Sequence, residues 1–139
     1  MTLKLEGHTI TAGVGAINAI VVNPHFALGL EHVRILGPGP ITNGGGNVFG
    51  TGVDLLSVSH SEVSGITVRG TRGNGIAALG NPGFISTDLK ITGNTLAAND
   101  GDGISLTDVL SSTADFDEET MHHYIGSNRP AESVAGLFC

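Results

Sequence analysis

Three five-residue segments recur at a fixed interval: Val33-Arg34-Ile35-Leu36-Gly37, Ser61-Glu62-Val63-Ser64-Gly65 and Leu89-Lys90-Ile91-Thr92-Gly93, which start 28 residues apart. Leu3-Lys4-Leu5-Glu6-Gly7 is the same unit, 30 residues before Val33. The alignment continues without gaps downstream, where Gly75-Ile76 falls on Gly103-Ile104. Self-similarity at a fixed period of this length indicates a repeat architecture.

Each repeat contains three short segments in which apolar and polar residues alternate, separated by Gly, Asn and Asp. The alternation indicates β-strands, and the glycines allow tight corners. A glycine followed by aliphatic residues also recurs, at Gly15-Ala16-Ile17, Gly52-Val53, Gly75-Ile76 and Gly103-Ile104. The sequence therefore predicts an all-β fold, a right-handed parallel β-helix of about four coils with three short strands per coil, over residues 1–108.

Two stretches rich in Gly, Pro and Asn interrupt the repeat. Pro38 to Asn47 lengthens one corner of the second coil, and Gly80-Asn81-Pro82-Gly83 lengthens a different corner of the third. Such composition is typical of surface insertions. Without roughly five residues from each, the coil has about 23 residues, a plausible length for one triangular layer.

The composition of the chain favours a thin, repetitive core. Of 139 residues, 22 are Gly, none is Trp, and only 14% are charged, against roughly 25% in ordinary soluble domains. The net charge of −7 argues against a nucleic-acid partner. The sequence contains no apolar run of about 18 residues, so no membrane span is predicted. The residues that follow Met1 do not have the pattern of a signal peptide. The one cysteine, Cys139, has no partner within the chain for a disulfide.

Gly7-His8-Thr9-Ile10, Val63-Ser64-Gly65-Ile66-Thr67-Val68 and Asn99-Asp100-Gly101-Asp102-Gly103-Ile104-Ser105-Leu106 resemble the right-handed β-helix repeat family. That family includes pectate-lyase-like proteins and copper-accessory β-helix proteins. The resemblance covers about residues 3 to 108. It implies the fold and leaves the activity open, since these repeats occur in lyases, hydrolases and structural spacers alike.

The repeat pattern ends near Leu106, so residues 109–139 are expected to form an irregular or helical C-terminal cap. Asp115-Phe116-Asp117-Glu118-Glu119 predicts a helix start, with Asp115 as N-cap and Glu118 three residues later. Met121, Tyr124 and Ile125 would give this helix an apolar side. The alternative is a disordered tail from Asn128.

Charged residues at equivalent positions of the first strand predict an outward ladder of Lys4, Arg34, Glu62 and Lys90. Equivalent residues in neighbouring coils lie about 4.8 Å apart. The three cations, Lys4, Arg34 and Lys90, are candidates for binding an acidic polysaccharide. The alternative is an ion-pair ladder in which Glu62 neutralises its neighbours.

Arg69, Arg72 and Asp100 are the catalytic candidates, because Arg69 aligns with Ala97 and Arg72 with Asp100 in the next coil. The resemblance implies that such an arginine acts as the base of a polysaccharide lyase, in which carboxylates hold Ca²⁺. Asp88, Asp100 and Asp102 could supply oxygen ligands to Ca²⁺. Asp100 and Asp102 equally fit as turn residues.

The remaining patterns predict no other cofactor. The histidines form no zinc-like pair, and His60 is expected to flank the side of Arg69. The glycines around Gly73-Asn74-Gly75 match a dinucleotide fingerprint without the helix that it requires. We therefore expect a non-catalytic, structural or weakly carbohydrate-associating segment of a larger secreted, cell-surface or periplasmic protein, with end-to-end self-association. The alternatives are a lyase or hydrolase acting on acidic glycans, and an inactive fragment.

Overall fold

The computed structural model describes residues 1–13, 17–23, 29–43, 50–81, 84–118 and 134–135. The regular structure in these residues is all β, and every pairing between named strands is parallel. The part of the chain that is described holds no helix able to cross a membrane. The expectation of an all-β fold with parallel sheets is confirmed.

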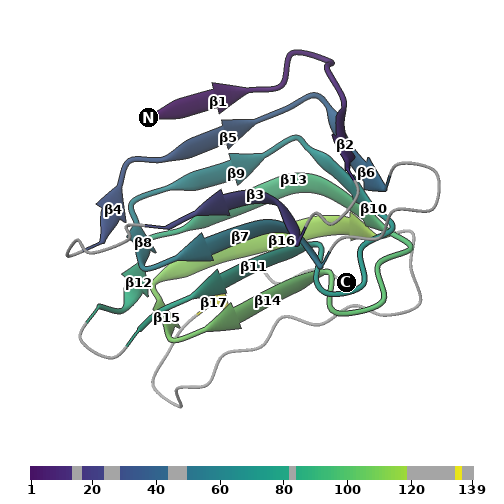
Figure 1. The fold of residues 1–139 in the computed structure, drawn as a ribbon. Helices are drawn as coiled ribbons and strands as arrows, with labels where there is room; N and C mark the ends of the chain where they lie inside the picture. The colour runs from purple at the N-terminus through teal and green to yellow at the C-terminus, as the bar shows by residue number, and fades with distance from the viewer. Residues whose placement is uncertain (14–16, 24–28, 44–49, 82–83, 119–133, 136–139) are drawn as a thin grey trace.

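The strands follow one another in the same order in successive layers, where a layer is one passage of the chain through the sheets (Figure 1). The first layer contains β1 (Thr2–Lys4), β2 (Ile10–Ala12), β3 (Asn18–Val22) and β4 (Leu30–Glu31). The second contains β5 (Arg34–Leu36), β6 (Pro40–Asn43), β7 (Thr51–Leu56) and β8 (Val58–Ser59). The third contains β9 (Glu62–Ser64), β10 (Thr67–Arg69), β11 (Ile76–Leu79) and β12 (Ser86–Thr87). The fourth contains β13 (Lys90–Ala97), β14 (Ile104–Thr107) and β15 (Val109–Leu110), and β16 (Ser112–Glu118) and β17 (Val134–Ala135) follow.

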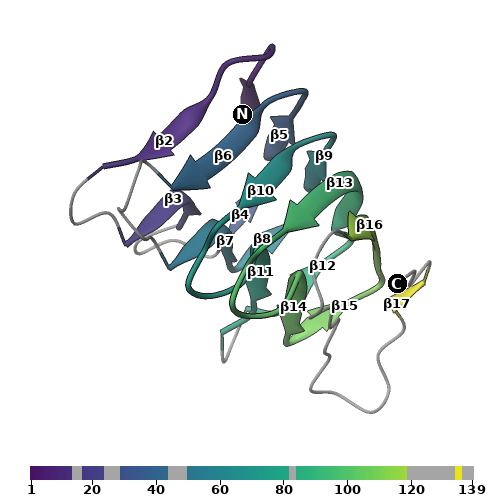
Figure 2. The same ribbon diagram turned by 90° about the vertical axis from the view of Figure 1, so that its right-hand side faces the viewer.

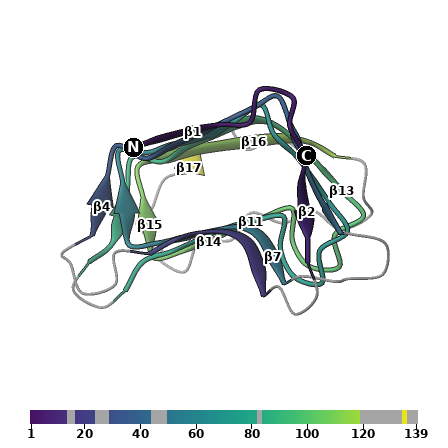
Figure 3. The same cartoon turned by 45° about the horizontal axis from the view of Figure 1, so that its top comes forward.

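Four groups of strands surround one interior, as the view along the stack shows (Figure 3). A nine-stranded sheet contains two legs, β1-β5-β9 and β2-β6-β10, which β13 joins by pairing with both β9 and β10. The second leg faces the viewer in Figure 2. A four-stranded sheet, β14-β11-β7-β3, and two two-stranded sheets, β4-β8 and β12-β15, complete the arrangement.

The short fourth side is a difference from the three strands per coil that the sequence predicts. Strands β4, β8, β12 and β15 have two residues each, too few for an alternating pattern to be recognised. A second difference concerns Ile17, expected in a strand but 80% exposed and just before β3. In β3 it is Ile20 that pairs with Val53.

Registers between the later layers follow the predicted period of 28. Arg34 pairs with Glu62 and Glu62 with Lys90. The alignments of Arg69 with Ala97 and of Ile76 with Ile104 are also confirmed. The first layer departs from the prediction by two residues, because Lys4 pairs with Leu36 instead of Arg34. A shift of two keeps side chains on the same face of a strand, so the alternation alone does not reveal it.

The expected 23-residue layer occurs where no insertion intervenes. Leu89 donates its backbone N–H to Ser112 at a sequence separation of 23. At the insertion after β11, Asn81 and Phe84 exchange backbone hydrogen bonds. The side-chain amide of Asn81 also donates to Ser57 at 2.9 Å.

One cluster of aliphatic side chains fills the interior, and its inward columns run through successive layers. Ile35, Val63 and Ile91 form one such column, each no more than 1% exposed. Burying one aliphatic side chain contributes about 1.5–3 kcal/mol, so the repeated columns are the main source of stability.

Buried polar side chains hold the corners by bonding to the backbone of the preceding layer. Asn94, fully buried, accepts the N–H of Ile66 at 3.1 Å and donates to the carbonyl of Val63 at 3.0 Å. Asn99 accepts the N–H of Thr71 at 3.1 Å. At a corner the backbone leaves the sheet ladder, and a buried N–H without a partner is costly, so these side chains supply it.

The predicted helix start is wrong. Asp115–Glu118 belong to β16, which pairs in parallel with β13. The last pair consists of Leu96 in β13 and Glu118 in β16. Pairing with the edge of β13 supplies inter-strand backbone hydrogen bonds along the segment, which outweigh a local capping pattern. The rest of that helix, with Met121, Tyr124 and Ile125, lies outside the described residues, as do Asn128 and Cys139. Strands β15 and β16 lie in the segment expected to be irregular or helical, so the layers extend to Glu118.

Candidate functional site

A charged column of three residues, Arg34, Glu62 and Lys90, lies on the outer face of β5, β9 and β13. Lys4 is not in it. Thr2 occupies the equivalent position in β1, and Lys4 lies two residues further along the strand. The predicted ladder of four is therefore correct for three residues, and Lys4 belongs to the neighbouring column with Leu36.

Arg34 and Glu62 form an ion pair. Nε and Nη2 of Arg34 donate to the same oxygen of Glu62 at 3.0 and 2.9 Å, and Ser64 donates to the other oxygen at 3.0 Å. The hydrogen bond from Arg34 holds the pKa of Glu62 below its usual range. The ion-pair interpretation thus holds for these two residues, while glycan binding by Lys4, Arg34 and Lys90 stays a prediction.

Arg72 and Asp100 lie in adjacent layers, as expected. The backbone N–H of Asp100 donates to the carbonyl of Thr71 at 2.9 Å, which fixes this alignment. Both side chains are exposed, and none of the ion pairs within 4.0 Å in the described residues joins them. Arg69 ends β10 and is exposed as well. A catalytic role for these residues stays a prediction.

The three candidate calcium ligands do not converge. Asp88 lies two residues before the start of β13, whereas Asp100 and Asp102 follow the other end of that strand. Asp102 is half-buried, its N–H donates to Asn74 at 2.9 Å, and burial raises the pKa of its carboxyl. Within the described residues, no group of three or more His, Cys, Asp or Glu side chains is placed to hold a metal ion.

A different set of polar residues gathers at the corner between the short side and the first leg. One residue lying one or two positions before each of β5, β9, β13 and β16 has left-handed backbone conformation: His32 (φ 57°), His60 (φ 49°), Asp88 (φ 52°) and Ser111 (φ 51°). For a non-glycine residue this conformation costs about 1–2 kcal/mol, although His and Asp tolerate it better than most.

Four of the side chains at this corner contact one another, and we call Glu31, His32, His60 and Asp88 the corner cluster. The rings of His32 and His60 stack with centroids 5.7 Å apart and planes at 14°. Nε2 of His60 lies 3.1 Å from Oδ2 of Asp88. The two oxygens of Glu31 each lie 3.9 Å from Nδ1 of one of the two rings. All four side chains are at least half exposed.

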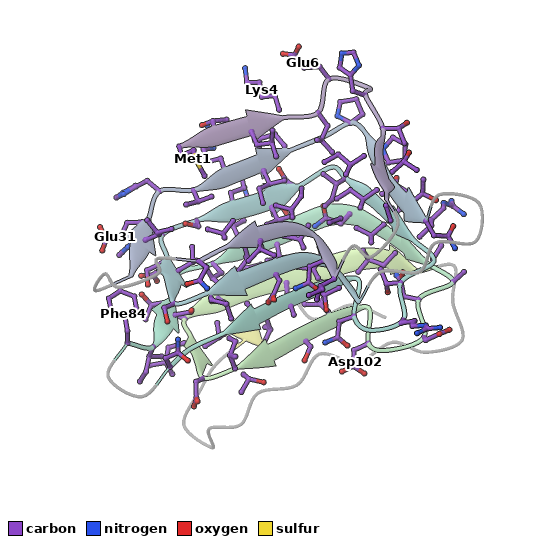
Figure 4. All side chains as sticks on the ribbon, in the orientation of Figure 1. Met1, Lys4, Glu6, Glu31, Phe84 and Asp102 are labelled. Carbon is purple, nitrogen blue, oxygen red and sulfur yellow. The ribbon has the colours of Figure 1, made fainter. Side chains whose placement is uncertain are left out.

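One aromatic ring lies at the start of the short side, next to Gly29. Phe84 occupies the space left by Gly29, where an added Cβ would meet the ring at 2.1 Å. Gly29 is two residues before Glu31, and Figure 4 shows Glu31 and Phe84 on the same side of the stack. The corner cluster itself combines carboxylates and imidazoles, groups that commonly contact polar, hydroxylated ligands.

The corner cluster escaped the sequence analysis although a signal was present. His32 and His60 are 28 residues apart, as are His60 and Asp88, so the repeat that defines the strands also defines this column. These residues directly precede the five-residue segments that start at Val33, Ser61 and Leu89. The expectation that His60 flanks Arg69 is replaced by its observed contacts with Glu31 and Asp88.

One more carboxyl group stands out on the four-stranded sheet. Asp54 of β7 accepts a hydrogen bond from the amide of Asn18 at 3.0 Å, and burial raises its pKa. Its neighbours in the same column are Val21, Ala77 and Ser105, none of them charged. Within the described residues, the column of Asp54 therefore holds no second carboxylate.

Comparison with known proteins adds no identification: no family model, no curated protein and no solved structure matches this chain.

Proposed function

We propose that this chain is a right-handed parallel β-helix repeat domain of the kind its sequence resembles, with a structural role and weak affinity for carbohydrate. In this proposal it is a segment of a larger secreted, cell-surface or periplasmic protein. The polar side chains that repeat along one corner support the binding role. The buried hydrogen bonds between successive layers support the structural role.

The single observation that carries the structural role is the use of the buried polar side chains. Ser61, Asn94 and Asn99 each bond to the backbone of the preceding layer, at Val33, Ile66 and Thr71 respectively. A group committed in this way holds a corner closed and is not available for chemistry. This pattern is what an elongated scaffold needs, because each layer must be tied to the next.

Carbohydrate association is assigned to the corner cluster and the adjoining charged column. Carboxylates and imidazoles recur there at the spacing of the layers, about 4.8 Å, beside the guanidinium of Arg34. An extended glycan lying along the stack would meet a donor or acceptor at each layer. The side chains are exposed, so each hydrogen bond contributes little net free energy, about 0.5–1.5 kcal/mol.

Binding to a panel of acidic and neutral glycans, with and without Ca²⁺, tests the proposal. We expect weak, calcium-independent binding that is lost in His60→Ala and Asp88→Ala and retained in the control Arg72→Ala. Unchanged binding in all three variants would remove the corner cluster from the proposal.

The alternative function is a lyase or hydrolase acting on acidic glycans, favoured by the alignment of Arg72 with Asp100 in adjacent layers. Release of unsaturated product in the same assay, lost in Arg69→Ala or Asp100→Ala, would establish that alternative. Calcium-dependent binding that is lost in Asp100→Ala would also support it, because carboxylate oxygens are the ligands that Ca²⁺ prefers.

A further inference from the structure

The two ends of the stack differ in how well they cover the interior. In the first layer Leu3 is 39% exposed, although it points inward in the same column as Ile35, which is 1% exposed. Ile10, Ile20 and Leu30 are likewise only partly buried, whereas their partners Ile41, Val53 and Val58 are fully buried. The N-terminal end therefore leaves inward aliphatic side chains of the core partly exposed.

The last layers show the opposite. Ile104, Val109 and Ala114 occupy the corresponding inward positions and are all fully buried. In the largest sheet part of the edge of β16 is also occupied, because β17 pairs with Ser112 and Thr113. The inward aliphatic side chains at the C-terminal end of the described stack are thus buried, although β14 and β15 still lie at sheet edges.

The backbone at the N-terminal end is also open. β1, β2, β3 and β4 each lie at the edge of their sheet. The carbonyl of Met1 and the N–H of Leu5 form hydrogen bonds with the neighbouring layer, at Arg34 and Leu36. The backbone groups of the alternate residues, Thr2 and Lys4, therefore face the open edge. An exposed strand edge above half-covered aliphatic side chains is a template for another strand.

We propose that this N-terminal end binds the same end of a second copy of the chain and so forms a closed dimer. A head-to-tail contact would place the open end against an end whose inward aliphatic side chains are already buried, whereas a two-fold axis places the partly exposed aliphatic side chains of both copies against each other. Charge also fits: Lys4 and Glu6 are exposed at this end with opposite signs (Figure 4). Neither takes part in the ion pairs found among the described residues, and the two-fold axis brings Lys4 of one copy toward Glu6 of the other.

Sedimentation of the full chain over a concentration series tests this arrangement. The wild type is expected to reach a dimer and no larger species. Leu3→Lys should raise the dimer dissociation constant by about tenfold or more, the equivalent of losing one buried aliphatic contact. The matched control is Leu79→Lys, because Leu79 is 37% exposed and lies on the outer face of β11, away from the N-terminal end. It should leave the dimer unchanged.

A charge exchange provides a second test that does not depend on packing. Lys4→Glu should weaken the dimer, and the double variant Lys4→Glu/Glu6→Lys should restore it. A wild type that stays monomeric while its β-sheet circular dichroism is intact would overturn the proposal, as would filaments, or an equal effect of Leu3→Lys and Leu79→Lys. The inference does not depend on glycan binding, so its failure and that of the proposed function are distinguishable.

Discussion

The two corners that flank β9 turn the chain through the same left-handed backbone conformation with different residues. At one end stands His60 (φ 49°) and at the other Gly65 (φ 69°). The next layer repeats the difference with Asp88 and Gly93. Glycine adopts this conformation without steric cost, whereas His and Asp do not. The Gly65 corner thus has only what the turn requires, whereas the His60 corner carries side chains that the turn does not require.

The environments of the two corners agree with this division. The Gly65 corner is held by the buried amide of Asn94. The His60 corner points its side chain outward to Glu31 and Asp88. The same conformation occurs at Ser57, Ala98 and Asp108, so the case for a ligand role rests on the contacts among Glu31, His32, His60 and Asp88.

Removing the buried amide should have the largest effect on stability. Asn94→Ala removes the side-chain acceptor of the buried Ile66 N–H and one donor to the Val63 carbonyl, so we expect a loss of about 2–4 kcal/mol in the free energy of unfolding. Chemical denaturation measures it. Asn43→Ala, at an exposed position, is the control and should change stability by less than about 0.5 kcal/mol. Equal effects would show that the Gly65 corner does not depend on its amide.

Substituting the glycine should have the next largest effect. A Cβ on Gly65 meets nothing closer than 3.8 Å, so the cost of Gly65→Ala comes from the backbone conformation alone. We expect about 1–2 kcal/mol, measured in the same way. A neutral outcome would mean that this corner can adopt another conformation.

The reciprocal substitution sharpens the comparison. His60→Gly removes the left-handed strain but adds freedom to the unfolded chain, so the net change should be within about 1 kcal/mol of zero. Glycan binding should be lost in the same variant. A loss of stability above about 2 kcal/mol would instead make the corner cluster a stabilising element.

The smallest effect is expected between the two corners, at Glu62 of β9. Since Arg34 lowers the pKa of Glu62 in the folded protein, the charged pair stabilises the fold above the ordinary glutamate value, about 4.3. That contribution is lost as the pH falls through the lowered pKa, because protonation then removes the pair. Glu62→Gln should cost about 0.2–1 kcal/mol at pH 7, in low salt, and nothing at pH 2. A difference that persists at pH 2 would point to packing in place of charge.

The candidate sites illustrate how far sequence reasoning reaches. The column of Arg34, Glu62 and Lys90 was predictable because the period between their strands is constant. Lys4 was misplaced because the first layer is two residues longer than the alignment assumed, and a shift of two leaves the alternation intact. The corner cluster was within reach of the same alignment. The contacts between its members were not, since they depend on backbone angles that a sequence pattern does not specify.

The sequence by itself determined the repeat, the β-strands, the inward aliphatic columns and the insertion points, because all of these follow from periodicity and from the backbone preferences of glycine. The tertiary structure decided the short fourth side, the strand over Asp115–Glu118 and the difference between the two ends of the stack. Each of these depends on whether a neighbouring layer offers an edge to pair with or a surface to cover. That condition is set by contacts between segments far apart in the chain, so no local pattern contains it.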